Sequence, residues 1–364
     1  MKNFKAIYII CLHVVFYACS KSVDVEVLSK DIRITEKNSD YYGLDNYELI
    51  SLTPLDNNTE CLIHNVDKVI VTSDKYIVLD NSRSPSIFSF TCDGAFCGRI
   101  AKIGHAKSEI SHVLDVAEKN DTVYVLQYDK MKIYDINGRY IRTIELDNGN
   151  HWERIISSEK GFVCSSYYTG VQNLVSVCDK DFKTLYSFVN TEEKTFSDFP
   201  YLRNPIWCSH GKIIYCNFFN SSFYVSEEDN SSVICYNILS DRKMTLEKAI
   251  AGKWGYEDIF LTYAYDGSCI WGYMNYNKRF YRYVFDISND DFSVFLSTDI
   301  LPKFHAYRDG YYYSLVSAND VLSIAKFAET KKGGGNERLY ELFSPFMNKV
   351  TDGDNYFVLK LRKK

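Results

Sequence analysis

The sequence has few prolines, no excess of basic residues and little helical periodicity. Only 6 of its 364 residues are Pro, and its formal net charge is -5. Without clustered Lys and Arg, a nucleic-acid partner is not expected, and without helical periodicity neither is a helical solenoid. Aromatic residues are abundant instead, with 30 Tyr and 23 Phe. Because aromatic rings fit pleated, half-buried surfaces, this composition is typical of a protein with many strands.

Motifs of common catalytic and metal sites are also missing. The chain has no phosphate loop, no Gly-x-Ser-x-Gly elbow, no His-Glu-x-x-His helix and no dinucleotide fingerprint. It has no Cys-x-x-Cys pair and no Cys/His cluster with zinc-site spacing. The segment 352–355 lacks the ligand spacing of an EF-hand loop. We therefore expect neither a cofactor nor a metal ion.

Residues 1–18 have the pattern of a secretory signal peptide. Two lysines are followed by an apolar stretch, residues 6–18, which is too short to span a bilayer. Its end, Phe16-Tyr17-Ala18-Cys19, resembles the bacterial lipobox. This resemblance implies cleavage before Cys19, thioether lipidation of Cys19 and acylation of the new N-terminus, with palmitate as the expected chain. An ordinary signal peptide that happens to contain Cys19 is the alternative.

The lipid would attach the protein to a membrane of the cell envelope. We expect the outer membrane, with the protein on its periplasmic or its outer side. Residues 19–45 are polar and charged without a sustained period, which predicts a lipidated tether that lifts the following domain off the membrane.

Of the 11 Cys, nine remain after the signal peptide and Cys19 are set aside. Several alternate with apolar residues inside predicted strands, so we favour free, buried thiols over a disulfide framework. Cys92 and Cys97 flank the Asp93–Gly94 turn and are the one candidate disulfide.

A pattern of short strands separated by polar breaks and turns recurs along the chain. It is clearest at residues 121–146, where two strands flank Asn137–Gly138, a strong hairpin signal for which both central residues are expected at positive φ. Comparable strands recur about every 40–55 residues, the period of four-stranded propeller blades. Residues 46–364 are therefore predicted to be an all-β, six-bladed β-propeller of four-stranded antiparallel blades.

The two ends of this domain are expected to share the last blade. Residues 47–52 look like an outermost strand with no blade before them, and 356–361 form the last clear strand. Pairing them would close the ring and leave no free edge. A short helical insertion is predicted near 318–342.

These segments also resemble a known family. Residues 76–80, 132–142 and 357–361 are similar to six-bladed β-propeller lipoproteins, NHL-repeat-like exported proteins of Gram-negative bacteria. The resemblance covers about 45–364 and implies the architecture and the export. The Gly-rich loop common in that family is replaced here by residues 104–110, of which only Gly104 and Glu109 match.

Loops between second and third strands, and loops leading into the next blade, are expected to gather on one face, here named the predicted face. Its best ligand-binding candidates combine aromatic rings with Arg and His: Tyr201, Arg203, Trp207, His105, Trp254 and Tyr256. Further members are Asn81, Arg83, Lys107, Tyr128, Trp152, Tyr167, Tyr168, Tyr276, His305 and Arg308. Packing of the aromatic members between blades is the competing interpretation.

Two functions are compatible with these features. The first is a non-catalytic binding or scaffold lipoprotein with a glycan, peptide or protein ligand at the predicted face. The second is a metal-dependent, lactonase- or lyase-like enzyme with its site in the central channel. The second needs three or four converging acidic, Asn or His side chains, for which Asp115 and Glu257 are candidates.

Overall fold

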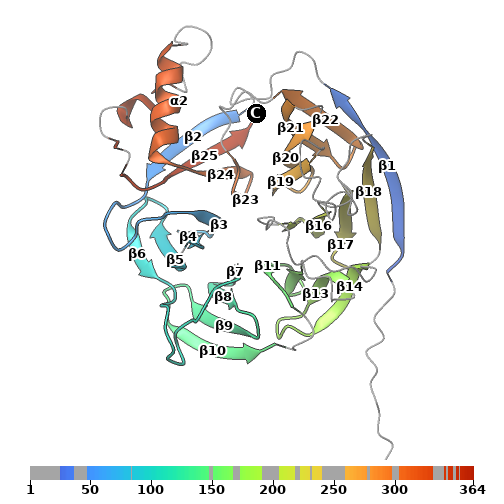
Figure 1. Cartoon of the computed structure of the whole chain (residues 1–364), viewed down its shortest axis with the longest axis horizontal. Coiled ribbons are helices and arrows are strands. Elements are labelled where there is room, and N and C mark those ends of the chain that lie inside the picture. Colours follow the sequence, from blue (N-terminus) through green and yellow to red (C-terminus); the bar gives the residue numbers. More distant parts are fainter. Residues whose placement is uncertain are drawn as a thin grey trace, which may run out of the picture.

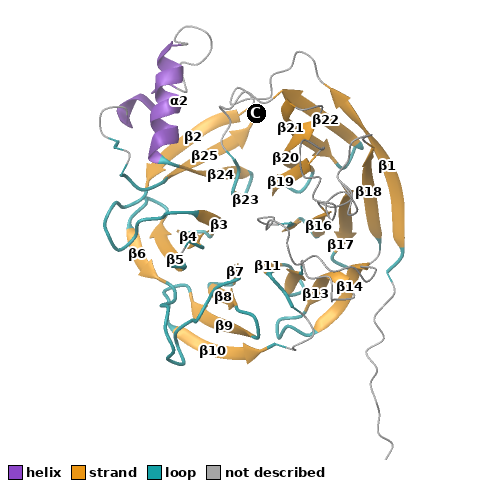
Figure 2. Ribbon diagram, in the orientation of Figure 1, coloured by secondary structure: helices purple, strands orange, loops and turns teal. Residues whose placement is uncertain are grey.

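The chain folds into sheets arranged around a central axis (Figure 1). Strands dominate, and one long helix lies outside the ring (Figure 2). The computed structural model describes residues 25–36, 47–82, 84–146, 151–166, 173–190, 205–217, 222–229, 232–239, 259–276, 279–296, 303–330, 340–341, 343–346, 350–351 and 353–364.

A set of four antiparallel strands that pair in succession is here named a unit, and the units are numbered in chain order. Units 1, 2 and 3 are each a separate sheet. Unit 1 contains β3 (Val66–Val71), β4 (Lys75–Asp80), β5 (Ser86–Thr91) and β6 (Phe96–Arg99). Unit 2 contains β7 (Asp115–Lys119), β8 (Thr122–Leu126), β9 (Lys130–Asp135) and β10 (Tyr140–Glu145). Unit 3 contains β11 (Arg154–Ser157), β12 (Phe162–Ser165), β13 (Asn173–Cys178) and β14 (Thr184–Asn190). In each unit the first strand is innermost (Figure 1).

Units 4 and 5 are joined into one nine-stranded sheet. Unit 4 contains β15 (Ile206–Ser209), β16 (Lys212–Asn217), β17 (Ser222–Glu227) and β18 (Val233–Leu239). Unit 5 contains β19 (Ile259–Tyr265), β20 (Cys269–Tyr276), β21 (Arg279–Asp286) and β22 (Asp291–Leu296). Between their outermost strands lies β1 (Val27–Glu36), parallel to both.

Strand β1 corrects two predictions. The expected six separate four-stranded blades are replaced by four such sheets and the nine-stranded sheet. The expected tether at 19–45 is also wrong for Val27–Glu36, which belongs to a sheet. The physical reason is that most side chains of β1 point to solvent while Ile32 is buried among unit 4 and 5 residues, so the strand carries little apolar pattern of its own.

The predicted closure by the chain ends is confirmed. The closing unit contains β23 (Ala306–Arg308), β24 (Tyr311–Val316), β25 (Phe357–Lys363) and β2 (Tyr47–Pro54). Strand β2 is antiparallel to β25, with Leu49 opposite Leu361 and Leu52 opposite Leu359. All four leucines are buried, so the first and last described parts of the ring share one apolar core.

The predicted helical insertion is confirmed as α2 (Ala318–Thr330), followed by a short 3-10 turn, Ser344–Phe346. Ser317 caps the helix, because Asp320 N donates to Ser317 Oγ at 3.1 Å. Val321 and Ala325 face the closing unit and are buried there against Phe343.

The hairpins between the third and fourth strands of units 1 and 2 use three-residue loops instead of the expected two-residue turn. Gly138 has φ 84°, whereas Asn137 is not among the residues with positive φ. Asp135 N donates to Arg139 O at 2.9 Å, and Gly138 N to Asp135 O at 3.0 Å. This is a type I turn closed by a glycine bulge. The prediction of positive φ at both residues was therefore wrong, although the hairpin is present.

The nine cysteines from Cys61 to Cys269 are free thiols, and six of them are buried. The preference for buried thiols is confirmed, and Cys92 and Cys97 are both free and exposed. Within the described residues, none of the helices has the length and apolar character needed to cross a bilayer.

Candidate functional site

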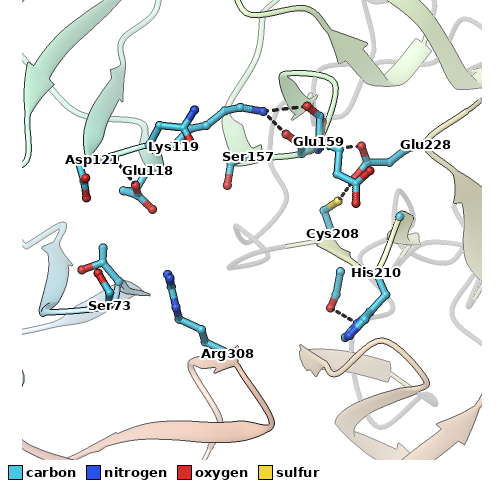
Figure 3. A pocket seen from close by; sticks show the side chains of 15 residues that line it. Ser73, Glu118, Lys119, Asp121, Ser157, Glu159, Cys208, His210, Glu228 and Arg308 are labelled. Atoms are coloured by element: carbon cyan, nitrogen blue, oxygen red, sulfur yellow. Dashed lines mark hydrogen bonds between the residues drawn. The ribbon is translucent and has the colours of Figure 1, made fainter.

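A polar pocket of about 450 Å³, here named the mouth pocket, lies at one end of the central channel (Figure 3). Five units contribute to its lining, which favours it as a site because ligand pockets combine a concave surface with converging polar groups. The lining residues are Thr72, Ser73, Glu118, Lys119, Asn120, Asp121, Ser157, Ser158, Glu159, Cys208, Ser209, His210, Gly211, Glu228 and Arg308.

Tight turns between the first and second strands of the units build the rim of the mouth pocket. Asn120 and Asp121 have φ of 53° and 58°, and His210 and Gly211 have φ of 51° and 70°. Two consecutive residues at positive φ define the two-residue turn that matches the twist of a hairpin. Asn, Asp and Gly tolerate this conformation best, so the local sequence fixes where these side chains point.

The thiol of Cys208 is held by a carboxylate at the wall of the pocket. Cys208 Sγ donates to Glu228 Oε1 at 2.7 Å, and Glu228 Oε2 accepts from Glu159 N at 2.8 Å and Lys160 N at 3.3 Å (Figure 3). Burial, followed by the hydrogen bond to Glu228 and its negative charge, raises the pKa of Cys208 well above its ordinary range. The thiolate is therefore disfavoured, which argues against a nucleophilic role.

The two cations of the pocket are anchored on backbone carbonyls. Lys119 Nζ donates to the carbonyl oxygens of Ser158, Glu159 at 3.1 Å and Gly161 at 3.4 Å, and thereby joins units 2 and 3. Arg308 donates to Val71 O at 2.8 Å and so joins the closing unit to unit 1.

Acidic side chains outnumber basic ones in the pocket. Four carboxylates (Glu118, Asp121, Glu159 and Glu228) face two cations, so the formal charge of the lining is 2 − 4 = −2 with neutral His210. Asp121 and Glu159 are exposed, whereas Glu118 accepts a hydrogen bond from Asp121 N at 2.9 Å. The pocket therefore suits a ligand that offers hydrogen-bond donors or positive charge.

The mouth pocket continues into a narrower cavity of about 250 Å³ along the channel. Both cavities share Glu118, Ser157, Cys208, Ser209 and Arg308. Its other walls come from the innermost strands and include Trp207 and His305.

Asp115, a candidate for the metal-dependent alternative, is tied into a buried charge network instead. Its Oδ2 accepts from Lys68 Nζ at 2.8 Å and from Ile155 N at 2.8 Å, and Lys68 Nζ also donates to Ile155 O at 2.5 Å. Burial lowers the pKa of Lys68 against the opposing effect of Asp115. Arg154 lies 3.7 Å from Asp67 in the same region. These contacts join the innermost strands of units 1, 2 and 3.

For the described ranges of the chain, no group of three or more His, Cys, Asp or Glu side chains is arranged to hold a metal ion. The second candidate, Glu257, lies outside the described residues.

Four of the six best ligand-binding candidates, Tyr201, Arg203, Trp254 and Tyr256, also lie outside the described residues. So do Arg83, Tyr167 and Tyr168 of the predicted face and the predicted lipidation site, Cys19. Among the described ones, Trp207 and His305 line the channel and Arg308 lines the mouth pocket. The structure thus brings these three to the axis, although only Arg308 reaches the mouth.

The remaining predicted residues do not meet at the axis. His105 and Lys107 are exposed in the loop between β6 and β7 and do not line the mouth pocket. Tyr128 packs on His112 in a tilted arrangement, with ring centroids 4.4 Å apart, and is 71% exposed. Trp152 is 4% exposed and packs in the apolar cluster between units 2 and 3, as the competing interpretation proposed. Asn81 is half-buried in unit 1, and Tyr276 ends β20.

The mouth pocket lies at the opposite end of the innermost strands from the loops that define the predicted face. The assignment of Arg308 to that face was wrong, because Arg308 ends β23 at a first-to-second-strand turn. First-to-second-strand turns and second-to-third-strand loops occupy opposite ends, because neighbouring strands are antiparallel. The described part of the predicted face does contain a cavity of about 910 Å³ beside unit 1, partly lined by His64, Asp80 and Ile103. That cavity lies to one side of the ring, whereas the mouth pocket receives polar groups from five units.

Sequence reasoning missed the acidic residues and turns of the mouth pocket. The signal available was the dipeptide that follows an innermost strand: Asn120–Asp121 after β7 and His210–Gly211 after β15. These dipeptides indicate two-residue turns, and turns at equivalent places in successive units must meet at one end of the axis.

The model of one protein family, described as "Domain of unknown function (DUF4934)", matches residues 30–359. A solved structure from Bacteroides fragilis, of a protein named as an exported protein, is 16% identical, covers 92% of this chain and 100% of its own, and superposes with a TM-score of 0.69. This similarity supports the propeller fold.

Two other solved structures are more distant. PorZ, a surface component of the type-IX secretion system of Porphyromonas gingivalis, is 13% identical over 70% of this chain and 32% of its own, with a TM-score of 0.40. A streptogramin B lyase is 12% identical over 67% of this chain and 74% of its own, with a TM-score of 0.43. None of the curated protein sequences matches this chain.

Proposed function

This chain belongs to the DUF4934 domain family, and we propose that it acts in that family as an exported, lipid-anchored propeller that binds a polar ligand at the mouth pocket. In this proposal units 4 and 5 are two blades joined by β1, so the ring has six blades. The protein is a binding or scaffold component of the cell envelope and carries out no reaction of its own.

The observation that carries the proposal is that polar side chains converge on the mouth pocket and that several of them already have hydrogen-bond partners. Five units direct side chains to one concave site, as binding requires. The thiol of the pocket and two of its charged groups are already occupied: Cys208 donates to Glu228, Glu228 accepts two further backbone hydrogen bonds, and Lys119 donates to three carbonyls. A nucleophile or base has to be available to its substrate, so this arrangement supports binding.

The expected ligand is a glycan or a peptide with hydroxyl or amino groups. The exposed carboxylates of Asp121 and Glu159 accept hydrogen bonds from such donors, and the lining carries a formal charge of −2. Anionic ligands are disfavoured by the same carboxylates.

The membrane anchor is proposed at Cys19, on the resemblance of residues 16–19 to a lipobox. Each buried methylene of an acyl chain contributes about 0.8 kcal/mol, so several chains on one residue hold the protein firmly on a bilayer, and the outer membrane is the proposed location. Mass spectrometry of the mature N-terminus tests the lipid. A Cys19→Ser variant should move from the membrane fraction to the soluble envelope fraction; unchanged membrane association would contradict the anchor.

Ligand binding is tested with the mature protein in detergent on glycan and peptide arrays. A Glu159→Lys variant reverses one exposed charge at the mouth, and Glu145→Lys makes the same change on the exposed outer strand β10. We expect a selective signal that Glu159→Lys weakens and Glu145→Lys preserves. No selective binding by the wild type, or equal effects of both variants, would refute the proposal.

A further inference from the structure

Strand β1 fixes the start of the described chain to the outer rim of units 4 and 5 (Figure 1). Val27 to Arg33 pair in parallel with Val233 to Leu239, and Ile34 to Glu36 continue along β22. Ile32 is 4% exposed and packs in the apolar cluster that the two units share. The body of the propeller therefore begins only a few residues after Cys19.

The first residues of β1 lie on the same face as the mouth pocket. In a four-stranded antiparallel unit, the fourth strand starts at the end where the first strand finishes. In unit 4 these ends are in contact, because Glu228 N donates to Gly211 O at 2.8 Å. At the start of β18, Val233 N donates to Glu26 O at 3.4 Å, which places Glu26 at this end of the rim.

The chain between the anchor and the rim is short. Val25, the first described residue, is the sixth residue after Cys19. A fully extended chain spans at most about 3.3–3.6 Å per residue, so the Cα atom of Val25 lies within about 22 Å of that of Cys19. The first two side chains of β1 are apolar and exposed, Val27 by 44% and Leu28 by 52%.

On the premise of the proposed lipid anchor at Cys19, we propose that the bilayer surface lies against the rim where β1 begins, and that the mouth pocket opens on the membrane-proximal side of the propeller. Val27 and Leu28 face the lipid headgroups. The nearby Lys30 ammonium is paired with Asp290, so lipid attachment and apolar contact hold the rim, with little need for anionic lipid. Ligands of the mouth pocket then have to enter through the space between the propeller and the bilayer.

The orientation is tested by fluorescence quenching on lipidated full-length protein in phosphatidylcholine vesicles with a spin-labelled headgroup. The background carries Cys92→Ser and Cys97→Ser, which remove the two exposed thiols. One fluorophore is attached in Leu28→Cys. The matched control is Ile103→Cys, 48% exposed in the loop that leads from β6 to β7, at the predicted face.

We expect several-fold stronger quenching at position 28 than at position 103. A Gly/Ser spacer of about 20 residues inserted after Ser22 adds roughly 25 Å of average reach and should abolish this difference. Equal quenching at both positions, with lipid on Cys19 verified by mass spectrometry, would overturn the orientation and leave the anchor intact. An unlipidated Cys19 would overturn both.

Discussion

The buried pair of Asp115 and Lys68 should be a strong determinant of stability, because it joins three units. Replacing Asp115 by Ala leaves the Lys68 ammonium buried without its counter-charge and leaves Ile155 N without its acceptor. Breaking a buried pair on one side costs about 3–5 kcal/mol. With a urea dependence of the unfolding free energy of about 3 kcal/mol per M for a chain of this size, the unfolding midpoint should fall by about 1–1.7 M.

The control for this experiment is Asp129→Asn, whose carboxylate is 54% exposed and 3.4 Å from Lys130. Exposed pairs contribute about 0–1 kcal/mol, so this variant should unfold near the wild-type midpoint. The double variant Lys68→Met/Asp115→Leu removes both charges and should recover most of the loss. Circular dichroism in urea measures all of them.

The pH dependence supplies an independent check. Burial already lowers the pKa of Lys68, and removal of Asp115 should lower it further. In this variant the unfolded chain then binds more protons than the folded one. The loss in free energy of unfolding caused by Asp115→Ala, relative to wild type, should therefore shrink as pH rises toward the ordinary lysine pKa. A midpoint shift below about 0.3 M, or a double variant as unstable as the single one, would refute the reasoning.

Three further predictions concern the closing unit and the mouth pocket. Burial alone would raise the pKa of Asp266, but hydrogen bonds from Cys269 N, Tyr312 and Ser268 outweigh it and lower that pKa. The stabilisation by Asp266 is therefore present above its unfolded-state pKa and is lost as pH falls through its folded-state pKa. Asp266→Asn should lower the free energy of unfolding at pH 7 and reduce its loss at acid pH, both measured by urea unfolding; the same loss at acid pH in variant and wild type would contradict this. Leu361→Ala removes a fully buried side chain between β2 and β24 and should cost about 2–5 kcal/mol, measured by urea unfolding; less than about 1 kcal/mol would argue against closure by the chain ends. Cys208 should react with iodoacetamide far more slowly than the exposed thiols. Glu228→Gln should accelerate this reaction, because it removes a negative charge that raises the pKa of Cys208. Peptide mass spectrometry that finds no acceleration would contradict the hydrogen-bonded pair of Cys208 and Glu228.

Local patterns predicted most of the strands. The strand-like segment at 47–52, which has no blade before it, and the last clear strand at 356–361 were sufficient to predict that β2 pairs with β25, because their pairing closes the ring. The Asn137–Gly138 hairpin was predicted correctly, although its loop has three residues. Turn length depends on the register of the flanking strands, which one dipeptide does not determine.

Strand β1 and the mouth pocket were not predictable from local patterns. Among the side chains of β1 whose burial is described, Ile32 is buried, Ile34 is partly buried and the others are exposed, and the strand partners lie more than 200 residues later in the sequence. Glu118, His210 and Arg308 belong to three different units and are unremarkable in sequence. These residues converge because the units form a ring. The sequence pattern predicted the ring, but it did not predict which strand ends carry the residues that meet at the axis.

Hydrogen–deuterium exchange with and without an array-identified ligand tests the central claim most directly, because it reports where the ligand binds. Binding at the mouth pocket predicts slower exchange in peptides covering 118–121, 157–160 and 208–211, with no change at the Asp93–Gly94 turn. Protection confined to the predicted face, at residues such as Asp80 and Ile103, would contradict it.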